Sequence, residues 1–230
     1  MKEITNFLFE NADEKYREFN KKIVSDTVYP MIGIKVPVIR KLAKSIAEEE
    51  SAQVFLSEKH TYYEECLLHG FIIAQEKKNV SKLLNEIDAF MPHIDSWATV
   101  DSVVSSSKAF IKDKNLVLKH VKKWLKSEKT YVIRFGIVTL LDYFIEPDYL
   151  EEILRLTLPV KTEEYYVNMA IAWLYSVMLV KHYDYTIKIF EENRIENTFV
   201  HNKSIQKAKE SFRIPKEKKI YLNSLKRIDK

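Results

Sequence analysis

The stretch from Tyr131 to Tyr143 reads YVIRFGIVTLLDY, and a similar stretch, YVNMAIAWLYSV, begins 35 residues later at Tyr166. YEECLLHGFIIA begins at Tyr63, 68 residues before Tyr131, and FVHNKSIQKAKES begins at Phe199, 33 residues after Tyr166. Each segment has helical spacing and precedes a second helical segment. A period of about 34 to 40 residues that holds two helices is typical of an α-solenoid.

The predicted fold class is therefore all-α, with stacked antiparallel helix pairs of the HEAT-like or ARM type. Three glycines and six prolines are too few for the many turns of an all-β fold. No glycine- or serine-rich linker divides the chain, so we expect one domain over residues 1–230. A stack of this kind curves, and its concave face is an extended binding surface.

Helical periodicity and short polar breaks set the expected bounds of the helices. In the second one, Val38, Leu42 and Ile46 mark one face, and Pro37 lies in the first turn, where proline is tolerated. The expected helices are Ile4–Asn20, Val36–Glu50, Ala52–Ser57, Tyr62–Gln75, Val80–Phe90, Ser96–Ser106, Lys114–Lys126, Tyr131–Phe144, Pro147–Thr157, Tyr165–Val180, Tyr183–Asn193, Asn202–Phe212 and Lys216–Lys226.

Charge and cysteine content narrow the classes of protein. A net charge of +4 and a pI near 8.8 permit nucleic-acid binding without demonstrating it. Lysines cluster at 112–126 and 203–230, and exposure of these lysines to solvent explains either cluster as readily as binding to DNA does.

The single cysteine, Cys66, fits a reducing cytoplasm, and we interpret it as a buried small hydrophobic residue rather than a nucleophile. No apolar run is long enough to span a membrane, and acidic residues come too early for a signal peptide, so we expect a cytoplasmic protein.

The usual signatures of metal and cofactor sites are missing from the sequence. No two histidines lie three or four residues apart, and there is no H-E-x-x-H motif, glycine-rich phosphate loop or G-x-S-x-G motif. The sequence therefore predicts no metal and no cofactor. The histidines are His60, His69, His93, His120, His182 and His201.

One constellation could carry chemistry. Trp97 and Asp101 are four residues apart, so they share one face of a helix. Arg134 and Trp173 fall on the first helices of the next two repeats, and all four side chains could converge on one groove. Taken singly, a tryptophan is most often core, and an aspartate in a first turn is most often a cap. The combination favours a functional site.

The residues around this constellation resemble a known family. MIGIKVPVIRKLAK (31–44), HIDSWATVDSVVSSSK (93–108), YVIRFGIVTLLDYFI (131–145) and YYVNMAIAWLYSV (165–177) are similar to segments of the AlkD-type DNA alkylation repair proteins, HEAT-like repeat DNA glycosylases. The resemblance runs from about Val28 to Pro215. Its W-x-x-x-D and A-I-x-W elements are specific when they occur together in this order.

The resemblance implies an enzyme that excises cationic N3- and N7-alkylated purines from double-stranded DNA. It implies that Asp101 is the catalytic carboxylate, that Trp97 and Trp173 line the groove, and that Arg134 binds the DNA backbone. It further implies a monofunctional glycosylase, a hydrolase of N-glycosyl bonds, which we expect to act as a monomer. An N7-alkylpurine is already cationic, so its base leaves neutral while positive charge develops on the sugar. A carboxylate and tryptophan faces would stabilise that charge.

The N-terminal stretch NADEKYREFNKKIVSDTVYP (11–30) departs from the family pattern. Active members place an aromatic residue from this part against the lesion, and Tyr16, Phe19 and Tyr29 are the candidates here. Two other functions therefore stay open. One is a non-catalytic scaffold that binds distorted or branched DNA, and the other is a protein-binding solenoid.

Overall fold

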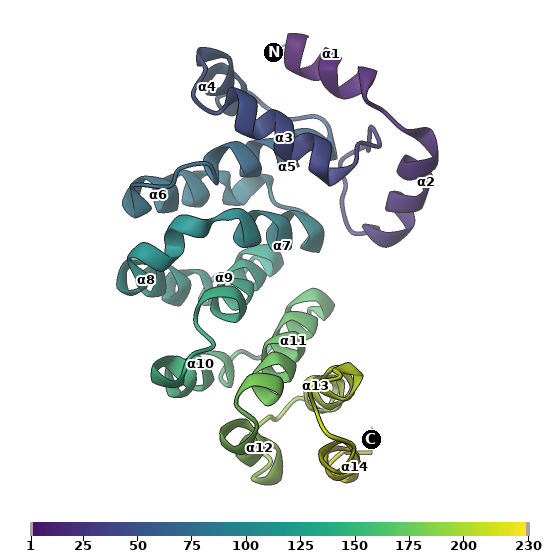
Figure 1. Ribbon diagram of the computed structural model, residues 1–230, viewed down its shortest axis with the longest axis vertical. Helices are drawn as coiled ribbons and strands as arrows, with labels where there is room; N and C mark the ends of the chain where they lie inside the picture. The colour runs from purple at the N-terminus through teal and green to yellow at the C-terminus, as the bar shows by residue number, and fades with distance from the viewer. Residues whose placement is uncertain (1, 229–230) are drawn as a thin grey trace. The chain divides into compact units, whose positions relative to one another are not determined.

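The computed structural model describes residues 2–228, and all regular secondary structure in this range is helical. The all-α fold class is confirmed (Figure 1). The described helices, with η denoting short 3₁₀ helices, are α1 (Lys2–Glu10), α2 (Glu14–Ile23), α3 (Val36–Ile46), α4 (Glu50–Leu56), α5 (Tyr63–Ile73), α6 (Val80–Phe90), η1 (Met91–His93), α7 (Trp97–Ser106), η2 (Lys108–Lys112), α8 (Lys114–Trp124), α9 (Thr130–Tyr143), η3 (Pro147–Tyr149), α10 (Leu150–Thr157), α11 (Tyr165–Lys181), α12 (Tyr183–Glu191), α13 (Thr198–Glu210) and α14 (Lys216–Ser224).

The repeat expected from the sequence is present. Helices α5, α7, α9, α11 and α13 begin at residues 63, 97, 130, 165 and 198, so their starts are 33 to 35 residues apart. The even-numbered helices α6, α8, α10 and α12 lie between them along the chain. Each repeat is therefore one pair of helices, as in other helical-repeat solenoids.

The chain divides into two compact units, Met1–His120 and Val121–Lys230. In the first unit, α5 packs against α3, α6 and α7; in the second, α11 packs against α9, α12 and α13. Every residue of α5 is buried, and so are most residues of α11. The odd-numbered helices thus stack side by side within each unit. The single domain expected for residues 1–230 stays a prediction.

Three of the expected helices differ from the structure in their bounds. The helix expected over Val36–Glu50 ends at Ile46, and Glu50 is the first residue of α4. The segment 4–20 forms two helices, because the chain breaks at Asn11–Asp13 and the Asp13 carboxylate accepts a hydrogen bond from the Tyr16 amide at 2.9 Å, which caps α2. Helix α13 begins at Thr198, four residues before the expected start. Its cap is Asn197, whose side chain accepts from the Val200 amide at 3.0 Å. In the last two cases a short polar side chain decides the boundary.

Gly70 allows α5 and α7 to approach closely. A Cβ atom at this position would collide with Cγ2 of Val103 and would lie 3.3 Å from the Phe90 ring. We expect Gly70→Ala to lower the free energy of unfolding by about 1–3 kcal/mol, because α7 must shift. The measurement is urea unfolding followed by circular dichroism.

Gly136→Ala in α9 is the matched control for Gly70→Ala. Its new Cβ would lie 3.2 Å from Cδ2 of the flexible Leu125 side chain and 3.5 Å from Cβ of Trp124. This substitution keeps the gain in helix propensity with little clash. A Gly70→Ala protein as stable as Gly136→Ala would contradict the close packing of α5 and α7.

Candidate functional site

Trp97 and Asp101 lie on the first two turns of α7, in the first unit. The helix begins here because Ser96 caps it, with its hydroxyl accepting from the Thr99 amide at 3.2 Å. Trp97 and Asp101 are both half-buried, and the Trp97 ring packs against the hydrophobic core of the unit. Trp97 and Asp101 are four residues apart on one helix, so the indole and the carboxylate share a helix face and lie one turn apart, as predicted.

The loop after α2 is fastened to the start of α7. The Trp97 amide donates to the Asp26 carboxylate at 2.9 Å. Asp95, directly before the Ser96 cap, accepts from the Thr27 hydroxyl at 2.8 Å and from the Val28 amide at 2.7 Å. Burial raises the pKa of the Asp95 carboxyl above its usual value. These two aspartates were not predicted from the sequence, because their partners lie about 70 residues away along the chain.

Arg134 lies in the second turn of α9, in the second unit, and is only 5% exposed. One guanidinium nitrogen, Nη1, donates to the backbone carbonyl of Tyr166 at 2.7 Å. Tyr166 is in the first turn of α11, so this bond fastens the starts of two neighbouring helices together. The side chain has a structural contact of its own, which fixes the direction of the guanidinium.

Trp173 lies in the middle of α11 and is half-buried. It lines a surface pocket of about 320 Å³ together with residues from the end of α11 and the end of α13. The pocket also contains the charged side chains of Lys181, Lys207, Glu210 and Arg213. The sequence prediction placed Trp173 on a binding face but did not identify these neighbours.

Comparison with models of known protein families shows which family the chain belongs to. Residues 4–201 match the family described as DNA alkylation repair enzyme. The chain belongs to this family. No curated protein matches it. As a member of the DNA alkylation repair enzyme family it acts in the repair of alkylated DNA, as the sequence resemblance predicted. The match begins before the expected Val28, so α2 and most of α1 are part of it.

The three N-terminal aromatic candidates differ in their surroundings. Phe19 is 59% exposed on α2, and its ring lies 6.5 Å from that of Tyr16. Burial, followed by the nearby Glu64 carboxylate, raises the pKa of the Tyr16 hydroxyl. Tyr29 is half-buried in the loop that contacts the start of α7, and its amide donates to the Thr27 hydroxyl at 3.2 Å. Of the three, Tyr29 is the one in the loop after α2, whose residues 26–28 are hydrogen-bonded to Asp95 and Trp97.

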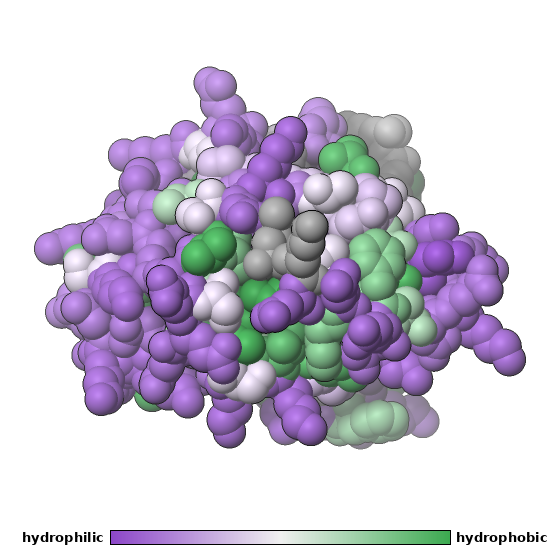
Figure 2. Space-filling view, turned by 90° about the horizontal axis from the view of Figure 1, so that it is seen from above, coloured by the Kyte–Doolittle hydropathy of each residue, from purple (hydrophilic) through white to green (hydrophobic). Residues whose placement is uncertain are grey.

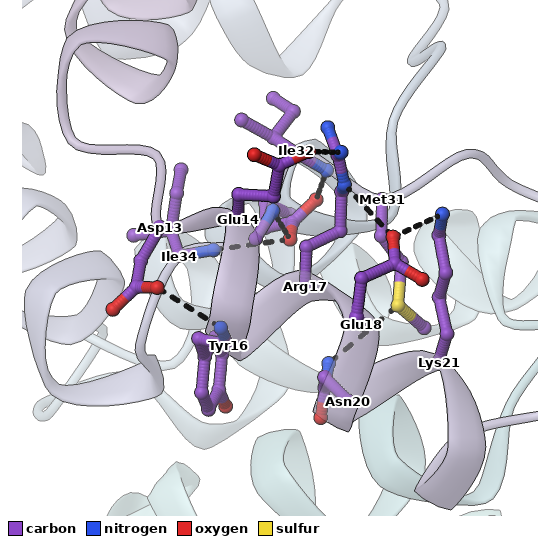
Figure 3. Close-up of polar contacts among 12 residues, drawn as sticks. Asp13, Glu14, Tyr16, Arg17, Glu18, Asn20, Lys21, Met31, Ile32 and Ile34 are labelled. Carbon is purple, nitrogen blue, oxygen red and sulfur yellow. Dashed lines mark hydrogen bonds and ion pairs between the residues drawn. The ribbon is translucent and has the colours of Figure 1, made fainter.

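Glu64 anchors the segment between α2 and α3. Its buried carboxylate accepts from three successive backbone amides, those of Ile32 at 2.9 Å, Gly33 at 2.7 Å and Ile34 at 3.3 Å (Figure 3). Gly33 has a φ of +100°, a conformation that L side chains rarely adopt. The turn therefore directs three amide N–H groups at one carboxylate. These hydrogen bonds replace those to water that the carboxylate loses on burial.

Cys66 is completely buried in α5, as predicted. Burial raises the pKa of its thiol to about 12. The thiolate is the nucleophilic form of cysteine, and at neutral pH this side chain stays protonated. Cys66 therefore behaves as a small apolar core residue.

Three histidines that are distant in sequence come together in the first unit. His60 Nε2 lies 2.6 Å from His69 Nδ1, and the His93 ring centroid lies 5.5 Å and 5.6 Å from those of His60 and His69. Within residues 2–228, no group of three histidine, cysteine, aspartate or glutamate side chains is arranged to hold a metal ion. Their spacing along the chain had no regular pattern that could predict this cluster.

Two of these histidines, His60 and His69, make the protein sensitive to acid. Burial lowers the pKa of His60 to about 4 and that of His69 to about 3, below the value of 6.5 expected for the unfolded chain. As the pH falls from 6.5 towards 4, the unfolded chain takes up protons that the folded protein does not. The free energy of unfolding therefore falls, by up to about 1.4 kcal/mol per pH unit for each such histidine.

The measurement for this acid sensitivity is the free energy of unfolding between pH 7 and pH 4, from urea titrations. We expect a shallower decline in His69→Gln, because the glutamine has no proton to gain. An equal decline in wild type and variant would contradict the assignment.

Figure 2 views the molecule from the end at which the chain begins, and this face is mostly hydrophilic with apolar side chains gathered near its middle. The exposed large hydrophobic residues between positions 3 and 28 are Phe7, Phe9, Phe19, Ile23 and Val28. Throughout residues 2–228, no helix combines the length and the apolar character needed to cross a membrane.

Proposed function

We propose that the protein is a DNA N-glycosylase that removes cationic N3- and N7-alkylated purines from duplex DNA without a cofactor. The observation that carries the proposal is the position of Trp97 and Asp101, half-buried and one turn apart at the start of α7. They occur in a chain that belongs to the DNA alkylation repair enzyme family. An indole face beside a carboxylate suits a sugar on which positive charge develops.

The reaction needs little help with its leaving group. An N7-alkylpurine carries a full positive charge, so the base departs as a neutral molecule when the N-glycosidic bond breaks. The bond electrons leave with the base, and the deoxyribose becomes oxocarbenium-like. Asp101 stabilises this charge and accepts a proton from the water that attacks the sugar. The products are a free alkylpurine and an abasic site.

The second unit contributes contacts to the DNA. We assign Arg134 the role that the sequence resemblance implies, which is contact with a backbone phosphate of the DNA. Trp173 places its indole against the deoxyribose backbone. These assignments give each residue the role implied by the sequence resemblance.

Alkyl transfer to a cysteine is a different way to repair alkylated DNA, and the structure disfavours it. Cys66 is the one cysteine in the sequence, and its thiol is buried with a raised pKa. A buried thiol that stays protonated is a poor acceptor for an alkyl group. Removal of the whole base suits the described side chains better.

Product analysis tests the proposal. The protein is incubated with duplex DNA that carries a single 7-methylguanine, and the products are identified by mass spectrometry. We expect free 7-methylguanine and an abasic site. Methylated protein with restored guanine would replace the glycosylase by an alkyl transferase. An intact lesion on a bound duplex would leave a DNA-binding scaffold.

A further inference from the structure

The pocket beside Trp173 has an unusual balance of charge. Lys181 comes from the end of α11, whereas Lys207 and Arg213 come from α13 and the turn after it. Glu210 is the single acidic side chain in the lining. Three cations against one carboxylate leave the pocket positively charged.

Among the described residues, none of the three cations has an anionic partner. Within residues 2–228, no carboxylate lies within 4.0 Å of the side-chain nitrogens of Lys181, Lys207 or Arg213.

Other lysines of the same unit do have acidic partners. Lys161 is paired with Glu196, and Lys218 is paired with Asp184. Glu210, the acidic residue in the pocket lining, accepts a hydrogen bond from the Gln206 side-chain amide at 3.5 Å. The cations around the pocket are therefore available to an external anion.

The shape and composition of the pocket suit one chemical group. The volume of about 320 Å³ is at the lower end of the range for small-molecule sites, and it suits a phosphate with part of a sugar. The indole of Trp173 supplies a flat apolar wall, and the cations surround it. Clustered lysine and arginine side chains bind the phosphates of nucleic acids, and an apolar wall beside them can pack against the adjoining sugar.

We propose that this pocket is a phosphodiester subsite, in which Lys181, Lys207 and Arg213 bind a backbone phosphate of the DNA while Trp173 contacts the adjoining sugar. The inference rests on the proposed function, because it names the part of the DNA that this surface takes. The subsite reads no base, so it contributes affinity rather than selection of the lesion.

The test compares two pairs of substitutions that remove the same charge. Lys181→Gln with Arg213→Gln changes two exposed cations of the pocket. Lys188→Gln with Arg194→Gln changes two exposed cations outside it, on α12 and in the turn that follows. The dissociation constant of an unmodified 20-base-pair duplex is measured from about 50 to 300 mM salt for wild type and both variants.

We expect the pocket pair to reduce the slope of log affinity against log salt by about 1.8, which corresponds to two lost phosphate contacts. The control pair should change the slope by less than about 0.5. Equal changes in the two variants would overturn the subsite. Binding of inorganic phosphate alone, with no difference between the variants on DNA, would also overturn it in favour of a site for a free anion.

The outcomes separate the subsite from the proposed function. If wild type binds the duplex and releases 7-methylguanine while the pocket pair behaves like the control pair, the subsite fails and the glycosylase stands. If wild type shows no salt-sensitive binding to duplex DNA, both fail. Circular dichroism of each variant verifies that the helices are intact.

Discussion

Asp101→Asn releases 7-methylguanine about 100- to 1000-fold more slowly than wild type under single-turnover conditions; this is the result we expect. Asparagine has nearly the same shape as aspartate but no negative charge. It cannot stabilise a cationic sugar or take a proton from water. Binding of the intact duplex should change by less than about threefold, because the carboxylate acts when the glycosidic bond breaks rather than in the bound ground state.

Asp148→Asn is the control for Asp101→Asn. Asp148 is exposed in η3 and is the same type of residue, so the substitution removes one negative charge from the surface. We expect excision within about twofold of wild type. Equal rates for Asp101→Asn and wild type would remove Asp101 from the chemistry, and equal losses in both variants would mean that overall charge rather than position matters.

Glu64→Gln should destabilise the protein by about 3 kcal/mol, the second large effect that we expect. The carboxylate accepts from the amides of residues 32, 33 and 34, and two of these bonds are to the same oxygen, Oε1. A glutamine side chain loses the charge and turns an NH₂ group towards one or more N–H donors. A buried donor that faces donors has no partner, and its desolvation is not compensated.

The measurement is the urea midpoint of Glu64→Gln beside Glu50→Gln, an exposed acid at the start of α4. We expect Glu50→Gln to stay within about 0.5 kcal/mol of wild type. If the two variants are equally stable, the three amides do not depend on the carboxylate. In Glu64→Gln we expect the N-terminal segment to loosen first, because the Glu64 carboxylate holds the turn that connects α2 to α3.

The repeated pairs of helices were predictable from the sequence because each buried helix repeats the same local pattern. The segments that begin at Tyr63, Tyr131 and Tyr166 correspond to α5, α9 and α11. The break at Asn11–Asp13 was not predictable from periodicity, because the apolar spacing continues across it and a cap decides the boundary. Apolar spacing defines the face that is buried, whereas capping defines the ends.

The candidate site was predictable only in part. A spacing of four residues predicted that Trp97 and Asp101 share a face, since this depends on one helix alone. The bonds from Thr27 and Val28 to Asp95 join segments almost 70 residues apart, and no local pattern indicates them. The same is true of His60, His69 and His93, which α5 and its neighbours bring together. The roles of Asp101, Arg134 and Trp173 remain predictions.

The most direct test of the proposed function compares two duplexes that differ in one base. One carries 7-methylguanine, which is cationic, and the other carries O6-methylguanine, which is neutral at the ring. If the positive charge of the lesion makes the base leave and Asp101 stabilises the sugar, the protein releases 7-methylguanine and leaves O6-methylguanine in place. Release of neither base from duplexes that are bound, or of both at similar rates, would contradict a glycosylase for cationic alkylpurines.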